Sequence, residues 1–340
     1  MPELRIHLLR TTAELEAFAP AWRALYEADP EATPFQHPAW LIPWWRQFGQ
    51  PELRAIVLSR AEVPVGLLPL YIYSDPPNRE RHLLPLGVGT TDYVGGVFAP
   101  TCTAADIRLA LELLAEDAGW DTLHLPQLRP GSRLLEALAA IPSAQPFDAQ
   151  PCSRMRAVPM TQLPGRIRQN AMYYRKRAAR QGNLVLNTID ASGIPATFDA
   201  LVRMHTERWQ QAGQPGVFAD SRVTEWHREA LPLLNAAGLL RLSTLTLNDE
   251  VIGVLYSLAD PPGRSDRTRY VYLTAYSGKY ADVGPGTVLL ALAIEEAAHQ
   301  GITTIDMLRG DEPYKRLWHF EPTPTKGVSI PHPARIAVAA

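Results

Sequence analysis

The stretch from Arg269 to Gly301 constrains the fold of this chain more than any other part of its sequence. Residues 269–276 alternate between aliphatic side chains and tyrosine or threonine, which is the pattern of a β-strand. Residues 287–300 are rich in alanine and leucine, and the glycine at 301 is of the kind that ends helices. The segment therefore predicts a strand, a glycine-rich loop and a helix.

The loop before this helix has the composition of a phosphate-binding turn. Gly284 and Gly286 would let the backbone approach a ligand closely. The first helical turn, which begins at Thr287, contains no acidic side chain. Unpaired amides and the positive end of the helix dipole favour an anion at such a position. The same residues also fit a simple turn, because a single Gly-Pro-Gly is a weak motif.

The composition is that of an ordinary globular protein. The chain has 340 residues, is 46% hydrophobic and 20% charged, and carries a net charge of −2. This length suits two domains, and the charge gives no global attraction to nucleic acid or to an anionic membrane. Residues 1–5 show no hydrophobic signal region, and no apolar run is long enough to span a bilayer. Cys102 and Cys152 are isolated, so we expect a protein of the reducing cytoplasm. No HxH or HExxH pattern occurs, so we expect no metal site.

The two halves of the sequence predict the same order of elements: strand, two helices, three strands, helix, strand and helix. Segments 119–125 and 301–307 hold the same place, because each begins with glycine and follows a helix rich in alanine and leucine. We infer a duplicated α/β unit, with chance as the alternative, since helix–glycine–strand is a common joint. The predicted units are 1–145 and 164–332, joined by a linker at about 143–163.

Several short motifs occur in an order that is typical of one family. In the second half they are Tyr173–Gly182, His205–Trp209 with Phe218, Tyr272 with the loop through Gly286, Ile305–Gly310 and Glu312–Trp318. In the first half they are Thr33–Trp40 and Asp92–Tyr93. In this order the motifs resemble the acyltransferase domain of the CelD/BcsL type, a branch of the GNAT superfamily that is also close to the FemABX peptidyltransferases.

This resemblance implies an α/β (α+β) fold of two tandem GNAT-like units, each a mixed, mostly antiparallel sheet flanked by helices. It also implies the transfer of an acyl group, most often acetyl from acetyl-CoA, to an amine. The cofactor pyrophosphate would lie at Val283–Thr287, with further contacts from Tyr276, Lys279 and Arg177. The family's usual Arg or Gln at the start of the glycine loop is missing, and Lys279 and Tyr280 stand upstream instead. The first half lacks the glycine pair, so we expect it to be a structural partner without a cofactor.

Transfer to an amine requires a base for the amine, polarisation of the thioester carbonyl and a proton for the leaving thiolate. Asp306 and Glu312 are candidate bases. The alternatives are an ion pair of Asp306 with Arg309 or Lys315 and a helix-cap role for Glu312. Tyr314 matches the position of the tyrosine that many GNAT enzymes use to protonate the thiolate, and a packing aromatic is its alternative. Lys315 would hold a carboxylate or phosphate of the substrate, or be solvated.

The first helix of the second unit lines the acceptor pocket in GNAT folds, which assigns His205, Arg208 and Trp209 to the substrate, together with Tyr272. A core histidine and a buried tryptophan are the simpler interpretations of His205 and Trp209. Arg208 has no place on the apolar face of the helix and is therefore expected near the acceptor.

A basic helix stands at the beginning of the second unit. Its cations are Arg166, Arg168, Arg175, Lys176, Arg177 and Arg180. They form a solvated face, or they contact the 3′-phosphate of CoA, an anionic acceptor or RNA. One basic helix in a chain of net negative charge does not establish nucleic-acid binding.

Three functions fit the sequence. The first is an acyl-CoA-dependent N-acyltransferase that acts on a small or glycan-linked amine by direct transfer in a ternary complex. The sequence contains no Ser-His-Asp or Cys-His set at recognisable spacing, which agrees with direct transfer. The second is an aminoacyl-tRNA-dependent transferase of the FemABX kind, although the long helical arm of many such enzymes is not apparent in the sequence. The third is an inactive binding module, against which the retained loop at Gly284 and the segment Glu312–Lys315 argue.

Overall fold

The computed structural model describes residues 3–49, 52–75 and 79–334. The first two residues of the N-terminal sequence considered above lie outside these ranges. Among the described residues, no helix combines the length and the apolar character that crossing a membrane requires.

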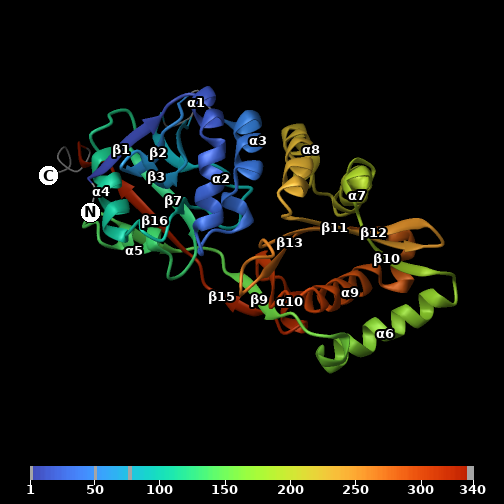
Figure 1. Cartoon of the computed structure of the whole chain (residues 1–340). Helices are drawn as coiled ribbons and strands as arrows, with labels where there is room; N and C mark the ends of the chain where they lie inside the picture. Colours follow the sequence, from blue (N-terminus) through green and yellow to red (C-terminus); the bar gives the residue numbers. More distant parts are fainter. Residues whose placement is uncertain (1–2, 50–51, 76–78, 335–340) are drawn as a thin grey trace. The chain divides into compact units, whose positions relative to one another are not determined.

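The chain forms two compact units, and each is described by itself (Figure 1). Unit 1 consists of Met1–Gln150 and Pro324–Ala340, and unit 2 consists of Pro151–Thr323. The expected units 1–145 and 164–332 differ from this division, because the strand at 326–331 belongs to unit 1 and the strand at 152–156, expected in the linker, belongs to unit 2.

The elements of unit 1 build two sheets. Their bounds are β1 (Leu4–Leu9), α1 (Thr12–Ala17), α2 (Ala19–Ala28), α3 (Pro38–Phe48), β2 (Ala55–Arg60), β3 (Val63–Leu68), β4 (Leu70–Ser74), β5 (Arg81–Pro85), β6 (Val97–Phe98), α4 (Ala104–Leu114), β7 (Thr122–Leu128), α5 (Arg133–Ala139), β8 (Gln145–Asp148) and β16 (Lys326–Pro331). The strand orders are β1-β2-β3-β6 and β4-β5-β7-β16-β8. Helices α4 and α5 pack on these strands through a continuous apolar core.

Unit 2 contains one sheet of seven strands. The bounds of its elements are β9 (Cys152–Arg156), α6 (Gly165–Ala179), β10 (Leu184–Thr188), α7 (Ile194–Gln211), α8 (Ser221–Ala236), β11 (Leu240–Leu247), β12 (Glu250–Ala259), β13 (Thr268–Tyr276), α9 (Pro285–His299), β14 (Thr304–Arg309), α10 (Pro313–Leu317) and β15 (Glu321–Thr323). The strand order is β10-β11-β12-β13-β14-β9-β15. Helices α6 and α9 cover one face of the sheet, and α7 and α8 cover the other (Figure 1).

The two units arrange their strands in a similar order, although unit 1 has two sheets and unit 2 has one, and they exchange one strand. In each unit a parallel pair follows the antiparallel strands: β5 with β7 in unit 1, and β13 with β14 in unit 2. Strand β9, which directly follows unit 1 in the chain, lies between β14 and β15 of unit 2. Strand β16, which follows unit 2, lies between β7 and β8 of unit 1. The tandem architecture expected from the sequence is therefore confirmed, and the exchange is a feature that the sequence did not reveal.

Two local predictions need correction. The expected linker at 143–163 contains two strands, β8 and β9, which are too short to give a clear periodicity and pair with distant partners. The capping box at Thr11 predicts one helix to about Ala28, but the structure has α1 and α2. Pro20 causes the break, because it lacks the N–H that would continue the helical hydrogen bonds.

Candidate functional site

The sheet of unit 2 opens between β13 and β14. Their parallel pairing covers three residue pairs, from Thr268–Thr304 to Tyr270–Asp306. Beyond these pairs β13 continues to Tyr276 and β14 to Arg309, so the carboxyl-terminal ends of the two strands separate. Such a gap in a sheet can admit an extended substituent of a ligand.

Helix α9 begins beside the end of β13 and has no side-chain cap. Its N-cap residue, Gly284, has φ 54° and ψ 51°, and Pro285 occupies the first helical position. The first intrahelical hydrogen bond runs from Val288 N–H to the Gly284 carbonyl at 3.1 Å. The amides of Gly286 and Thr287 have no hydrogen-bond partner within the described residues, as is usual for the first turn. Two donors and the positive end of the dipole are thus available to an anion.

The two glycines of this loop make room for aromatic rings of the chain itself. A Cβ atom on Gly284 would lie 2.5 Å from Cδ2 of Tyr174, and one on Gly286 would lie 2.9 Å from Cε1 of Tyr276. Space for these rings is therefore one reason for glycine at both positions, and the close approach of a ligand stays a prediction. Tyr174 belongs to the motif Tyr173–Gly182, but nothing in the sequence indicated its partner.

The cations expected to bind the cofactor already have acidic partners. Lys279 Nζ lies 3.1 Å from both carboxylate oxygens of Glu250, and Arg177 lies 3.2 Å from Asp282. All four side chains are largely exposed, so these ion pairs are weak and can exchange partners. Sequence reasoning missed Asp282, although it stands only two residues before Gly284.

Arg208, Tyr276 and Tyr314 lie together at the open end of the sheet. The Arg208 guanidinium lies over the Tyr276 ring, with Cζ 5.1 Å from the ring centroid. Tyr314 is close enough to both for their charges to affect its pKa, and its side chain is 44% exposed. Burial, followed by the Glu312 carboxylate, raises the pKa of Tyr314 to about 12. The phenol therefore keeps its proton at neutral pH and is able to donate it.

The ammonium group of Lys315 binds other groups of the protein itself. Its side chain is buried, and Nζ donates hydrogen bonds to the carbonyl oxygens of Leu308, Arg309 and Gly310 at 3.3, 2.8 and 3.2 Å. Nζ also lies 2.9 Å from Oε2 of Glu312. An ammonium engaged in this way does not fit the expected role of holding a substrate anion; it instead fixes the loop that carries Glu312.

Asp306 is fully buried in β14 and forms an ion pair. Arg154 Nε on β9 donates to Asp306 Oδ2 at 2.7 Å, and Oδ1 accepts from the Leu308 N–H at 2.8 Å. Both carboxylate oxygens are therefore occupied, which favours the structural alternative over the general base. The sequence suggested Arg309 or Lys315 as the partner, and it missed Arg154 because β9 was assigned to a linker.

The histidine of helix α7 lies in an aromatic cluster. His205 is 6% exposed, with its ring centroid 5.0 Å from that of Phe218 and 5.8 Å from that of Trp209. Its Nδ1 atom is buried and has no hydrogen-bond partner in the described part of the chain. Burial and, to a smaller extent, the Arg208 charge lower the pKa of His205. Trp209 is 38% exposed and is thus not the buried tryptophan of the simpler interpretation.

Tyr272 belongs to a second group of rings on the same side of the sheet. Its ring lies 5.5 Å from His227 and 5.3 Å from Tyr256. His227 and Tyr256 are fully buried. Tyr272 therefore lies between this core cluster and the α7 face, where it is half-buried.

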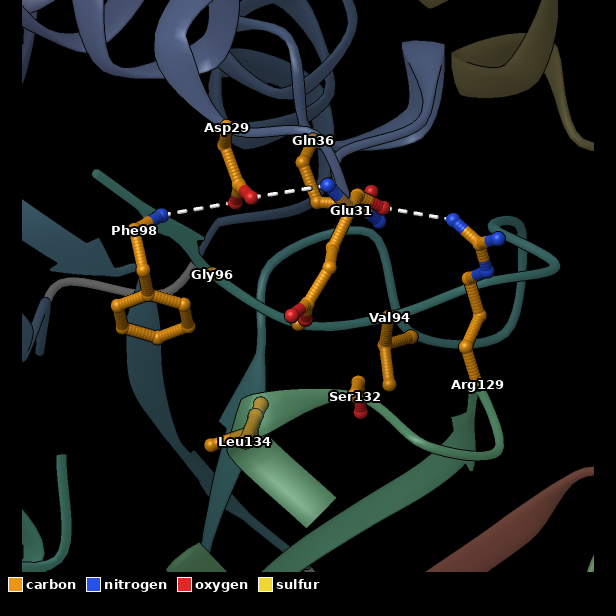
Figure 2. A pocket seen from close by; sticks show the side chains of 10 residues that line it. Asp29, Glu31, Gln36, Val94, Gly96, Phe98, Arg129, Ser132 and Leu134 are labelled. Carbon is orange, nitrogen blue, oxygen red and sulfur yellow. Dashed lines mark hydrogen bonds between the residues drawn. The ribbon is translucent and has the colours of Figure 1, made fainter. Parts of the chain in front are cut away.

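Unit 1 contains a small polar pocket (Figure 2). Buried Asp29 accepts hydrogen bonds from the N–H groups of Phe98 and Glu31 at 2.8 and 3.0 Å, and Arg129 donates to the Glu31 carbonyl at 2.6 Å. The cavity of about 30 Å³ is of the size of a single water molecule. Nowhere in the described ranges do three or more His, Cys, Asp or Glu side chains group in a way that could hold a metal ion.

Comparison with known proteins agrees with this architecture. Residues 165–316 match the family model described as "Acetyltransferase (GNAT) domain". Most of unit 2 is thus similar to GNAT acetyltransferase domains. No curated protein matches the chain.

Solved structures share the fold over nearly the whole chain. FemX has 13% identity and a TM-score of 0.67, with 98% of this chain and 99% of FemX covered. The C-terminal domain of a putative lysylphosphatidylglycerol synthetase from Agrobacterium fabrum has 11% identity and a TM-score of 0.60, with coverage of 97% and 95%. L-PGS from Bacillus licheniformis has 11% identity and a TM-score of 0.57, with 94% of each chain covered. These identities show the fold alone, which is GNAT/FemABX-like.

Proposed function

We propose that unit 2 transfers an acyl group, in the simplest case acetyl, from acyl-CoA to an amine by direct transfer in a ternary complex. The observation that carries the proposal is the uncapped start of α9 beside the open end of the sheet. Two unpaired amides at Gly286 and Thr287 suit a pyrophosphate. The thioester would then extend into the gap between β13 and β14.

The residues around this gap fit the proton transfers of the reaction. The amine nitrogen would attack the thioester carbonyl and give its proton to a base, for which half-exposed Glu312 is the better candidate. The C–S bond would then break, and the thiolate would take the proton of Tyr314. Asp306 is less suitable as the base, because both of its oxygens are already engaged.

The α7 face supports an acceptor site next to the gap. The Arg208 guanidinium is held by a ring, and no carboxylate pairs with it in the described residues. The unpartnered Nδ1 of His205 could bind a polar group of the acceptor. Trp209, which is partly exposed, would cover the apolar part of a small or glycan-linked amine.

Thr287 gives a selective test of the cofactor site. Glutamate at this third helical position is favourable for the helix dipole, yet it places a negative charge beside the proposed phosphates. We expect Thr287→Glu to keep or raise the melting temperature and to weaken acetyl-CoA binding at least about tenfold, as measured by calorimetry. Thr287→Gln, which has the same shape without the charge, should bind within about twofold of the wild type. Equal affinities of the two variants would remove the proposal.

The second candidate donor is an aminoacyl-tRNA. The observation that favours it is α6, which has five cations and no acidic residue. Assays that offer either acetyl-CoA or aminoacyl-tRNA as the only donor distinguish the two functions. Transfer from tRNA together with no detectable binding of acyl-CoA would select the second candidate.

A further inference from the structure

A groove lies between the second half of α6 and the start of β10. It encloses about 400 Å³ and is lined by Met172, Arg175, Lys176, Ala179, Gly182, Asn183 and Leu184. A volume of this size is within the range of small-molecule sites. The groove is lined by a different side of α6 from the one that carries Arg177 towards Asp282.

The floor of this groove is fixed by hydrogen bonds. Asn248, in the turn between β11 and β12, accepts from the Asn183 N–H at 2.9 Å and donates to the Gln181 carbonyl at 3.1 Å. A Cβ on Gly182 would lie 1.8 Å from Asn248 Oδ1, so a larger residue here would displace the Asn248 side chain from these hydrogen bonds. The groove is thus formed before any ligand binds, which lowers the ordering cost of binding.

The lining of the groove combines positive charge with apolar surface. Arg175 and Lys176 have no carboxylate partner among the described residues, and none of the lining residues is acidic. Met172 is 46% exposed and lines the groove together with Ala179 and Leu184. Two cations next to an apolar wall suit a phosphate group attached to an organic body.

We propose that this groove is a second ligand site of unit 2, which binds a phosphate ester of about nucleotide size. The proposal is independent of the acyl transfer, because it uses neither the start of α9 nor the gap in the sheet. The phosphate ester has two sources, a nucleotide or the headgroup of phosphatidic acid, and both offer a phosphomonoester group to Arg175 and Lys176.

The competing explanation is that these cations only stabilise the end of α6. Cations in the last turn of a helix interact favourably with its dipole. In that case Arg175→Gln/Lys176→Gln would lower the melting temperature, and no ligand effect would be specific to the groove. The test therefore needs a control with the same change of charge on the same helix.

Binding of 3′,5′-ADP and of dioctanoyl phosphatidic acid to the full chain tests the proposal by calorimetry. At least one probe should bind, and Arg175→Gln/Lys176→Gln should weaken it about tenfold or more, since two charge-assisted hydrogen bonds are lost. Ala179→Trp, which fills the groove without a change of charge, should weaken the same probe comparably. The control Arg166→Gln/Arg180→Gln, with the same loss of charge outside the groove, should bind within about twofold of the wild type.

The probe that binds identifies the source of the phosphate ester. Binding of 3′,5′-ADP indicates a nucleotide, and binding of phosphatidic acid indicates a lipid headgroup. No binding of either probe at millimolar concentration would overturn the proposal. Equal weakening in the groove variant and in the control would also overturn it, because the interaction would then be a diffuse attraction of the whole helix, as for RNA.

Discussion

The guanidinium of Arg208 lies over the ring of Tyr276, with Cζ 5.1 Å from the ring centroid. The same ring is in the place that a side chain on Gly286 would need. Tyr276 thereby connects helix α7, the end of β13 and the first turn of α9. Tyr314 lies close enough to Arg208 and Tyr276 for both to affect its pKa. This arrangement is the structural basis of the first prediction.

Tyr314→Phe should lower kcat with little change in the affinity for acyl-CoA. The substitution removes one proton and almost no volume, and general acids typically contribute about 10²–10⁴-fold. Steady-state kinetics and calorimetry measure the two quantities separately. Tyr173→Phe, which makes the same change at an exposed phenol on α6, is the control and should leave both unchanged. A kcat within about twofold of the wild type would show that water, and not Tyr314, protonates the leaving thiolate.

We predict that Asp306 stabilises the fold and is not the general base. Asp306→Ala removes the acceptor of Arg154 Nε and of the buried Leu308 N–H, so we expect a loss of about 3 kcal/mol in the free energy of unfolding. Asp306→Asn keeps one oxygen for Leu308 and should lose less. Chemical denaturation gives these values. If Asp306→Asn instead abolishes turnover while the protein remains as stable as the wild type, Asp306 is the base.

Local patterns predicted the elements of the site but not the contacts between them. The alternation at 269–276 and the glycine at 301 predicted β13 and the end of α9, because these signals lie within one element. The pair of Arg154 and Asp306 joins residues 152 positions apart, on a strand too short to show a period. For the same reason, the exchange of β9 and β16 was not predictable, since strand partners depend on the whole fold rather than on a local pattern.

The loop at Gly284 gives a second example of this limit and a stability prediction. Gly284→Ala should cost about 1 kcal/mol for the left-handed backbone, and more because the new Cβ would displace Tyr174. Gly301→Ala is the matched control, because Gly301 also has a positive φ, of 71°, but nothing lies within 4 Å of its Cβ position. We expect the free energy of unfolding to fall clearly further for Gly284→Ala. Equal losses would mean that Tyr174 moves aside without cost.

The pH dependence of stability follows from buried His37 of unit 1. Its Nδ1 accepts from the Ala39 N–H at 3.0 Å at the start of α3, and burial lowers its pKa to about 3. Below a pH of about 6.5 the unfolded chain binds a proton at this histidine and the folded chain does not. The free energy of unfolding should therefore decrease as the pH falls from about 6.5 towards 4, by at most ~1.4 kcal/mol per pH unit for this group.

His37→Asn isolates this effect, because asparagine also caps a helix but does not titrate. The variant should be less stable than the wild type at pH 7, since it fills less of the buried site. The difference in the free energy of unfolding between the wild type and the variant should decrease as the pH falls. Only the wild type loses stability through protonation of residue 37 in the unfolded chain. Urea denaturation at pH 7, 6, 5 and 4.5 measures the two curves. Curves that stay parallel over this range would show that His37 becomes protonated in the folded protein as readily as in the unfolded chain.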